Sequence, residues 1–203
     1  IFRHKITSIH NPVYPAVFKE HDEVKKPEKI ILCVARLCFQ KNQDLLIDAF
    51  HQLSIDTKEW RLIFVGDGEH YDRLYSKVNN LGLQDRIIFY GNVKDVSSWY
   101  QKADIFAFPS YFEGFPNALA EALSWGIPCI GLRNTLGVNS LIEDNVNGLL
   151  VDSNSEDFSS ALKILVNNVN LRKKMSLEAK KISLKYSPKN SYILWESLFE
   201  SMT

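Results

Sequence analysis

The sequence predicts an α/β protein built on a doubly wound, Rossmann-like parallel sheet, with extra helices at its C-terminal end. Three observations support this fold class. Short, continuously apolar runs recur along residues 30–151, as expected of strands that are buried on both faces. Amphipathic stretches with helical spacing separate these runs, which indicates right-handed crossover helices between parallel strands. Beyond Val151 only helical patterns remain.

The expected elements follow in order from residue 30. The first strand is the apolar run 30–35, and a polar turn and a helix over 42–53 come after it. Further short apolar runs predict the remaining strands, at 62–65, 87–90, 105–108, 128–131 and 148–151. Apolar side chains at helical spacing predict the helices between them, at 71–81, 95–100 and 117–125. Gly82 and Gly126 suit the C-terminal caps of two of these helices.

Three further helical stretches are expected near the C-terminus, around 158–165, around the basic stretch 172–181 and over 191–202. The start of the chain contains three prolines and shows no clear period. The sequence therefore divides into three expected parts: an entry segment or linker over 1–27, a sheet domain over 28–187 and a final helix over 188–203.

Composition excludes several classes of protein. Lys and Arg number 24, and so do Asp and Glu, so a chain built to coat nucleic acid is disfavoured. Three cysteines at these spacings favour neither a disulfide framework nor a zinc site. No secretory signal and no run of about 20 apolar residues is found, so we expect a cytoplasmic location. The basic stretch 172–181 could contact the inner face of a membrane, although a solvated helix face is the favoured interpretation.

The most informative segment is 113–121, which lies between an expected strand and an expected helix. Gly114 allows the backbone to approach a ligand closely, and Pro116 suits the first helical turn. The free amides that follow, together with the helix dipole, predict a site for an anion such as a diphosphate. Glu113 would stand at the mouth of the sheet. Glu121 would project from an otherwise apolar stretch of helix, where a carboxylate needs a partner. The alternative is that Glu113 is an ordinary loop carboxylate and Glu121 an ordinary residue on the helix surface.

Three other strand ends could contribute to the same site. Arg36 and Lys41 follow the first strand, and two cations beside a helix N-terminus suit a diphosphate, although a solvated turn is an equal alternative. The glycine turn 66–68 is a weak signal on its own, and it lacks the three-glycine pattern of an NAD enzyme. The third strand end, 90–93, has a backbone that could meet a flat base.

These pieces, in this order, resemble the C-terminal donor-binding domain of retaining GT-B glycosyltransferases of glycosyltransferase group 1, or family 4. The resemblance covers residues 30–152 closely and the terminal helices loosely. The following stretches carry it: VARL (34–37) with Lys41, FVGDG (64–68), FYGNV (89–93) and ADI (103–105). The segment 109–122 adds PS, EGFPN and EA, and GIP (126–128) and NGLLV (147–151) follow.

The resemblance implies a role for each matching residue. Arg36 and Lys41 would hold the donor diphosphate, and Glu113 would contact the sugar hydroxyls near the anomeric carbon. Glu121 would accept hydrogen bonds from the ribose hydroxyls, and the backbone at Val93 would face the base. Backbone amides for the sugar and phosphates would come from the segment that contains Gly114, Phe115, Asn117, Ala118 and Leu119.

The sequence departs from the family pattern at three places. The family often has glycine before the arginine and after the lysine, where this chain has Ala35 and Asn42. It usually has a glutamate among glycines near 133–140, where this chain reads RNTLGVNS. These departures concern the sugar side of the site more than the nucleotide side.

The family's activity gives the expected function: transfer of a sugar, with retention, from a nucleotide-diphosphate sugar to a glycan or lipid-linked acceptor in polysaccharide or glycoconjugate synthesis. The acceptor would be held by an N-terminal domain of the same enzyme, to which the helix from Ser191 would return, and residues 1–24 would include a strand and the interdomain linker. No cofactor is expected. No metal is expected either, because Asp67 and Glu69 form the only acidic pair beside a strand end.

Two other functions compete with this interpretation. A nucleotide-sugar epimerase of related fold would need additional acid and base residues, and no His or Asp is placed for that role. A non-catalytic sugar-nucleotide-binding module is the other alternative. The presence of Glu113, Arg36, Lys41 and Glu121 together argues against it.

Overall fold

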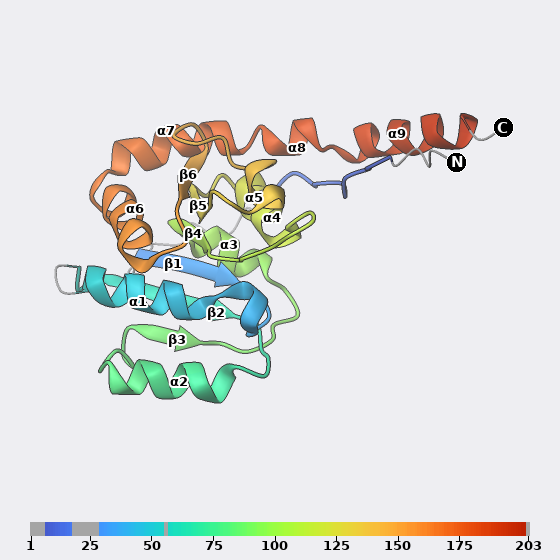
Figure 1. Cartoon of the computed structure of the whole chain (residues 1–203). Coiled ribbons are helices and arrows are strands. Elements are labelled where there is room, and N and C mark those ends of the chain that lie inside the picture. Colours follow the sequence, from blue (N-terminus) through green and yellow to red (C-terminus); the bar gives the residue numbers. More distant parts are fainter. Residues whose placement is uncertain (1–6, 18–28, 55–56, 202–203) are drawn as a thin grey trace.

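Six parallel strands form one sheet in the spatial order β3-β2-β1-β4-β5-β6 (Figure 1). The computed structural model describes residues 7–17, 29–54 and 57–201. The strands are β1 (Lys29–Val34), β2 (Trp60–Val65), β3 (Ile87–Phe89), β4 (Ile105–Phe108), β5 (Cys129–Leu132) and β6 (Gly148–Val151). All six predicted strands are confirmed, with ends shifted by no more than two residues. The doubly wound, Rossmann-like fold class is confirmed by this order and direction.

Helices cover both faces of the sheet because each strand is apolar on both sides. The helices are α1 (Gln43–Ser54), α2 (Tyr71–Asn80), α3 (Ser97–Lys102), α4 (Asn117–Ser124), α5 (Leu136–Asn139), α6 (Ser155–Asn167), α7 (Val169–Ala179), α8 (Ile182–Lys185) and α9 (Pro188–Glu200). One core cluster joins α1, α2 and α6 to one face. The other joins α3, α4, α5 and α8 to the opposite face. The two clusters enclose the sheet between two helical layers.

The strand order reverses between β1 and β4. A chain that leaves these two adjacent parallel strands turns to opposite sides of the sheet, so their carboxyl ends border a crevice in which such folds bind ligands. The strand arrows of β1 and β3 point to the side from which α9 projects (Figure 1). The loops that carry Arg36, Lys41 and Glu113 therefore lie at this crevice.

Three short helical elements in the described part of the chain were not predicted from the sequence, and one of them is α8, which follows the end of α7 at Ala179. A 3₁₀ turn spans Phe39–Lys41, and Asn42 follows it with a φ of 51°, so α1 begins at Gln43 rather than at Asn42. The helix α5 occupies the segment in which this chain departs from the family pattern. The helix α3 begins at Ser97, two residues later than expected, and Asp95 Oδ1 just before it accepts a hydrogen bond of 2.9 Å from the Ser97 amide.

The final helix starts earlier than its apolar pattern indicated. Ser187 accepts a hydrogen bond from the Asn190 amide through its side chain, and Pro188 occupies the first turn. The helix α9 therefore begins at Pro188, ahead of the apolar pattern over 191–202. Most of α9 projects from the body of the domain (Figure 1). Its exposed side chains include Tyr192, Trp195 and Phe199.

The described part of the entry segment, 7–17, runs alongside the start of α9 without forming a strand (Figure 1). The Val13 amide donates to the Tyr186 carbonyl at 2.7 Å. The rings of His10, Phe115 and Tyr186 form a cluster with centroid distances of 5.1–5.5 Å. Of the predicted entry segment and strand, the parts at 1–6 and 18–27 lie outside the described residues.

The glycine turn after β2 has a packing role. A Cβ at Gly66, where φ is +131°, would lie 2.1 Å from the Ala35 carbonyl oxygen, and one at Gly68 would lie 2.3 Å from that of Leu37. The Leu37 amide donates to the Asp67 carbonyl at 2.9 Å. The two glycines therefore let the loops after β1 and β2 touch backbone to backbone.

This contact predicts the effect of one added methyl group. Gly68→Ala should lower the free energy of unfolding by about 1–3 kcal/mol, since the new Cβ meets rigid backbone rather than a flexible side chain. Gly114→Ala is the matched control, because a Cβ there has no neighbour within 4 Å. Urea unfolding of both variants measures the difference, and equal midpoints would contradict the packing role of Gly68.

Candidate active site

A pocket of about 550 Å³ lies at the carboxyl ends of the strands. All four loops in which the sequence placed chemistry contribute to it. Its lining includes seven predicted site residues: Arg36, Lys41, Val93, Glu113, Phe115, Asn117 and Ala118. The pocket is also lined by four apolar residues that were not predicted as site residues: Val34, Val65, Val96 and Phe108. Their apolar character gave no signal beyond that of an ordinary core residue.

Lys41 and Glu113 form an ion pair inside this pocket. The Lys41 Nζ contacts Glu113 Oε1, and the side chains are only 18% and 9% exposed. The same ammonium lies 5.6 Å from the centre of the Phe108 ring, at the end of β4. A cation and a carboxylate are thus held together at the crevice, largely out of water, where their mutual attraction is weakly screened.

Arg36 presents a second cation to the pocket. Its residue is exposed, and its carbonyl accepts a hydrogen bond of 2.9 Å from Gln43 Nε2, which ties the loop to the first turn of α1. Among the described residues, no carboxylate forms an ion pair with its guanidinium. Within the described ranges, Arg36 is therefore a positive group at the mouth of the pocket that no carboxylate neutralises.

The N-terminus of α4 supplies backbone donors to the same space. Pro116 precedes the helix, and Asn117 and Ala118 open it on the wall of the pocket. The amides of a first helical turn have no partner within the helix and point outward. The Leu119 amide instead donates to the Pro116 carbonyl at 3.1 Å, and the residue is fully buried away from the pocket.

The loop between β4 and α4 rests on α5. A Cβ at Gly137 would lie 2.5 Å from the Gly114 carbonyl oxygen and 2.7 Å from that of Glu113, so only glycine fits there. Thr135 Oγ1 donates to the Ser110 carbonyl at 2.8 Å. Gly114 itself is exposed between Glu113 and Phe115 rather than in the lining. The segment that departs from the family pattern thus supports the Glu113 backbone from behind.

Glu121 lies about one turn along α4 from Asn117 and Ala118 on the pocket wall. It is exposed and lines a neighbouring cavity of about 360 Å³, which shares Phe115 and Asn117 with the first. Its Oε2 accepts a hydrogen bond of 2.9 Å from the Tyr100 hydroxyl. Burial, and then the Glu121 carboxylate, raise the pKa of Tyr100 well above its usual value, so the hydroxyl keeps its proton.

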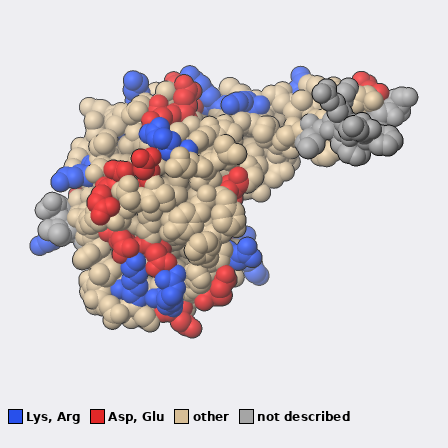
Figure 2. Space-filling model, in the orientation of Figure 1, with Lys and Arg blue, Asp and Glu red and all other residues tan. Residues whose placement is uncertain are grey.

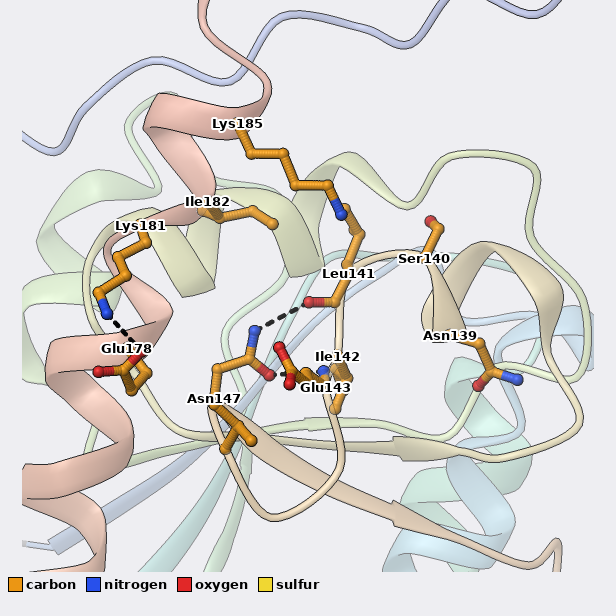
Figure 3. A pocket seen from close by; sticks show the side chains of 11 residues that line it. Asn139, Ser140, Leu141, Ile142, Glu143, Asn147, Glu178, Lys181, Ile182 and Lys185 are labelled. Atoms are coloured by element: carbon orange, nitrogen blue, oxygen red, sulfur yellow. Dashed lines mark hydrogen bonds and ion pairs between the residues drawn. The ribbon is translucent and has the colours of Figure 1, made fainter.

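A different cavity, of about 440 Å³, lies between α7–α8 and the loop that follows α5 (Figure 3). Its polar groups bond to one another: Asn147 donates to the Leu141 carbonyl and accepts from the Glu143 amide, and Lys181 pairs with Glu178 at 2.6 Å. None of the predicted site residues lines it. These satisfied contacts indicate a structural role.

On the face that Figure 2 shows, positive and negative side chains are interspersed, in keeping with the zero net charge. On α1 and α2, Arg73 pairs with Asp44, and Lys77 pairs with Asp48. Within the described ranges, no group of three or more His, Cys, Asp or Glu side chains is arranged to hold a metal ion. None of the helices in those ranges is long and apolar enough to cross a membrane.

A doubly wound parallel sheet with cations and a helix N-terminus at its switch point is the architecture of the C-terminal half of GT-B proteins. The sequence model of the family described as "Glycosyl transferases group 1" matches residues 17–182. The chain belongs to this family.

Two curated relatives illustrate the similarity. An uncharacterized glycosyltransferase of Haemophilus influenzae is 30% identical over 95% of this chain and 54% of its own length. A Campylobacter jejuni alpha-1,4-N-acetyl-D-galactosaminyltransferase, whose name specifies a sugar chain on PP-undecaprenol, is 29% identical over 88% of this chain and 50% of its own. The chain therefore spans about half the length of these relatives.

Solved structures show the same fold. S. aureus TarM, crystallised with UDP and other ligands, gives a TM-score of 0.89 at 23% identity, over 98% of this chain and 40% of that one. The C-terminal domain of a group 1 family protein, LpcC from Francisella tularensis, gives 0.74 at 26% identity. Here the match covers 87% of this chain and 96% of that chain.

The geometry of the Lys41–Glu113 pair predicts an energetic coupling. Lys41→Met leaves a largely buried carboxylate without its cation, and Glu113→Gln leaves the cation without its carboxylate. The double variant should recover part of the loss, with an interaction free energy of about 0.5–3 kcal/mol in a double-mutant cycle. Chemical denaturation of the four proteins measures this quantity, and strictly additive losses would show that the pair does not stabilise the site.

Proposed function

We propose that this chain is the donor-binding half of a retaining glycosyltransferase that uses a nucleotide-diphosphate sugar. The acceptor is a glycan or a lipid-linked sugar, and the product belongs to cell-surface polysaccharide or glycoconjugate synthesis. The observation that carries the proposal is the convergence of Arg36, Lys41, Glu113 and the α4 N-terminus on one pocket at the switch point. The UDP in the TarM structure and the named activity of the Campylobacter relative support it.

The pocket suits the two charges of a donor. A diphosphate fits beside Arg36 and the amides that open α4, where a cation and a helix dipole act on it together. Lys41 reaches the same space but is paired with Glu113, so a bound diphosphate shares the ammonium with that carboxylate. The sugar then lies next to Glu113, and the base lies along the wall formed by Val93 and Val96.

Transfer moves charge in two directions at once. Negative charge builds on the departing diphosphate, and Arg36, Lys41 and the helix N-terminus stabilise it in place, without having to reorganise. Positive charge builds on the anomeric carbon, as in other reactions at glycosidic centres. Glu113 is the carboxylate placed to orient the sugar and to offset this charge.

The competing functions fit the pocket less well. An epimerase needs an acid and a base that exchange protons with the sugar. The described residues that line the pocket include no histidine, and Asp67 Oδ1 accepts a hydrogen bond from the Gly68 amide. A purely binding module has no use for a carboxylate buried against Lys41, because Glu113 competes with an anionic ligand for that cation.

The proposal includes no metal cofactor. The phosphate positions are served by Arg36, Lys41 and the amides of α4, whereas a Mg²⁺ site needs carboxylates directed at the phosphates. Among the residues that the structure describes, two carboxylates line the pocket. Glu113 is paired with Lys41, and Asp67 Oδ1 accepts a hydrogen bond from the Gly68 amide in its own loop.

The partner of this chain is an N-terminal domain of the same enzyme, which holds the acceptor. Support comes from the length of the relatives and from α9, whose exposed Tyr192, Trp195 and Phe199 form an apolar surface on a projecting helix. The enzyme acts in the cytoplasm, at the inner face of the membrane where a lipid-linked acceptor is presented. Exposed lysines on the 172–181 stretch would add electrostatic attraction there, whereas Arg172 itself turns inward to the carbonyls that end α6.

Nucleotide titration tests the donor site. Arg36→Ala and Lys41→Ala should each weaken the binding of a nucleoside diphosphate by roughly 1.5–3 kcal/mol, because each removes a charge-assisted contact. Lys163→Ala, on the exposed face of α6 outside this pocket, should leave affinity unchanged. Isothermal calorimetry with UDP and GDP provides the measurement, and unchanged affinity in both pocket variants would remove these residues from the site.

Transfer assays test whether this chain binds the donor and an N-terminal half holds the acceptor. The 203-residue chain should bind nucleotide but transfer sugar negligibly, since orienting the acceptor can supply about 7–11 kcal/mol of the barrier reduction. Joining it to the N-terminal half should restore transfer, also in the presence of EDTA. In that enzyme Glu113→Ala should lower kcat more than nucleotide affinity. Robust transfer by the short chain, or loss of activity on chelation, would refute the corresponding part of the proposal.

A further inference from the structure

Tyr100 is a buried residue with a hydroxyl group that the packing of the core does not require. It lies on α3, where its residue is 3% exposed, and its ring packs near Phe106 and Trp125. A phenylalanine would fill this apolar space equally well. The hydroxyl is therefore the feature that needs an explanation.

The hydroxyl reaches two oxygen atoms, and both belong to α4. It lies 2.9 Å from Glu121 Oε2 and 3.2 Å from the Ala118 carbonyl oxygen. A phenol has one proton to donate, and the charged, nearer carboxylate is the stronger acceptor. Tyr100 thus holds one oxygen of Glu121 from the buried side of the helix, one turn from Ala118 on the pocket wall.

We propose that Tyr100 is a positioning residue for Glu121, which it orients for recognition of the ribose diol of the donor nucleotide. This inference rests on the proposed function and on the ribose contact that the family resemblance implies for Glu121. The carboxylate of an exposed glutamate otherwise rotates about three side-chain bonds. Fixing it on binding costs conformational entropy and lowers the affinity. A hydrogen bond from a rigid, buried phenol fixes it before the nucleotide arrives.

The direction of the contact suits a diol. Oε2 keeps a second lone pair beside the bond from Tyr100, and Oε1 is not used in that bond. One carboxylate can then accept both ribose hydroxyls at once. Glu121 also borders the cavity that shares Phe115 and Asn117 with the donor pocket, so a ribose between the diphosphate and the base comes within its reach.

The experiment compares a ribonucleotide with its 2′-deoxy form. Tyr100→Phe removes only the hydroxyl. Affinity for UDP or GDP should fall about three- to tenfold, whereas affinity for the matching 2′-deoxynucleotide should change less than about twofold. Calorimetry at one temperature measures all these constants. Tyr186→Phe is the matched control, because its buried hydroxyl donates to the Ser140 carbonyl and not to Glu121.

A second comparison separates positioning from general support of the fold. In a Glu121→Ala background, Tyr100→Phe should no longer change the ratio of ribose to deoxyribose affinity, since the group it acts through is gone. Equal weakening of both nucleotides by Tyr100→Phe, or the same change in ratio with and without Glu121, would overturn the positioning role. A parent protein that binds neither UDP nor GDP would refute the proposed function and this inference with it.

Discussion

The ion pair between Lys41 and Glu113 joins the two loops on which the site depends. Lys41 follows β1 and Glu113 follows β4, the adjacent strands between which the order of the sheet reverses. Chains leaving these strands diverge to opposite faces, so contacts outside the sheet must join their loops. At the rim, Gln40 accepts a hydrogen bond from the Tyr111 amide and donates one to the Phe112 carbonyl. The largely buried Lys41–Glu113 pair joins the same loops across the crevice, and it places a cation, a carboxylate and the start of α4 around one space.

Backbone contacts support this arrangement on both sides of the pair. Gly66 and Gly68 bring the loop after β2 against the loop after β1, and Gly137 brings α5 against the backbone at Glu113. Each contact leaves no room for a side chain, so the loops rest on rigid surfaces rather than on adaptable ones. The charged groups are consequently presented by fixed loops, which is how preorganised electrostatic sites act.

The sequence was sufficient to predict every described strand, because short, continuous apolar runs bounded by turn residues are typical of buried strands. It also placed the four loops of the pocket, since parallel strands end at one edge. It could not predict α5, which spans only Leu136–Asn139 and is stabilised by the loop that it supports. Nor could it predict the Tyr100–Glu121 contact. The apolar pattern of α3 does not distinguish a tyrosine that only packs in the core from one whose hydroxyl also forms a hydrogen bond.

The ring cluster of His10, Phe115 and Tyr186 links the entry segment to the wall of the pocket. Phe115 lines the pocket at the carboxyl ends of the strands, and His10 belongs to the segment that leads into the sheet. Displacing the segment must therefore either break a ring contact or carry Phe115 with it. Thermodynamic reciprocity then requires that whatever fills the pocket against Phe115 also biases the position of the segment, so pocket occupancy and segment position are coupled in one equilibrium.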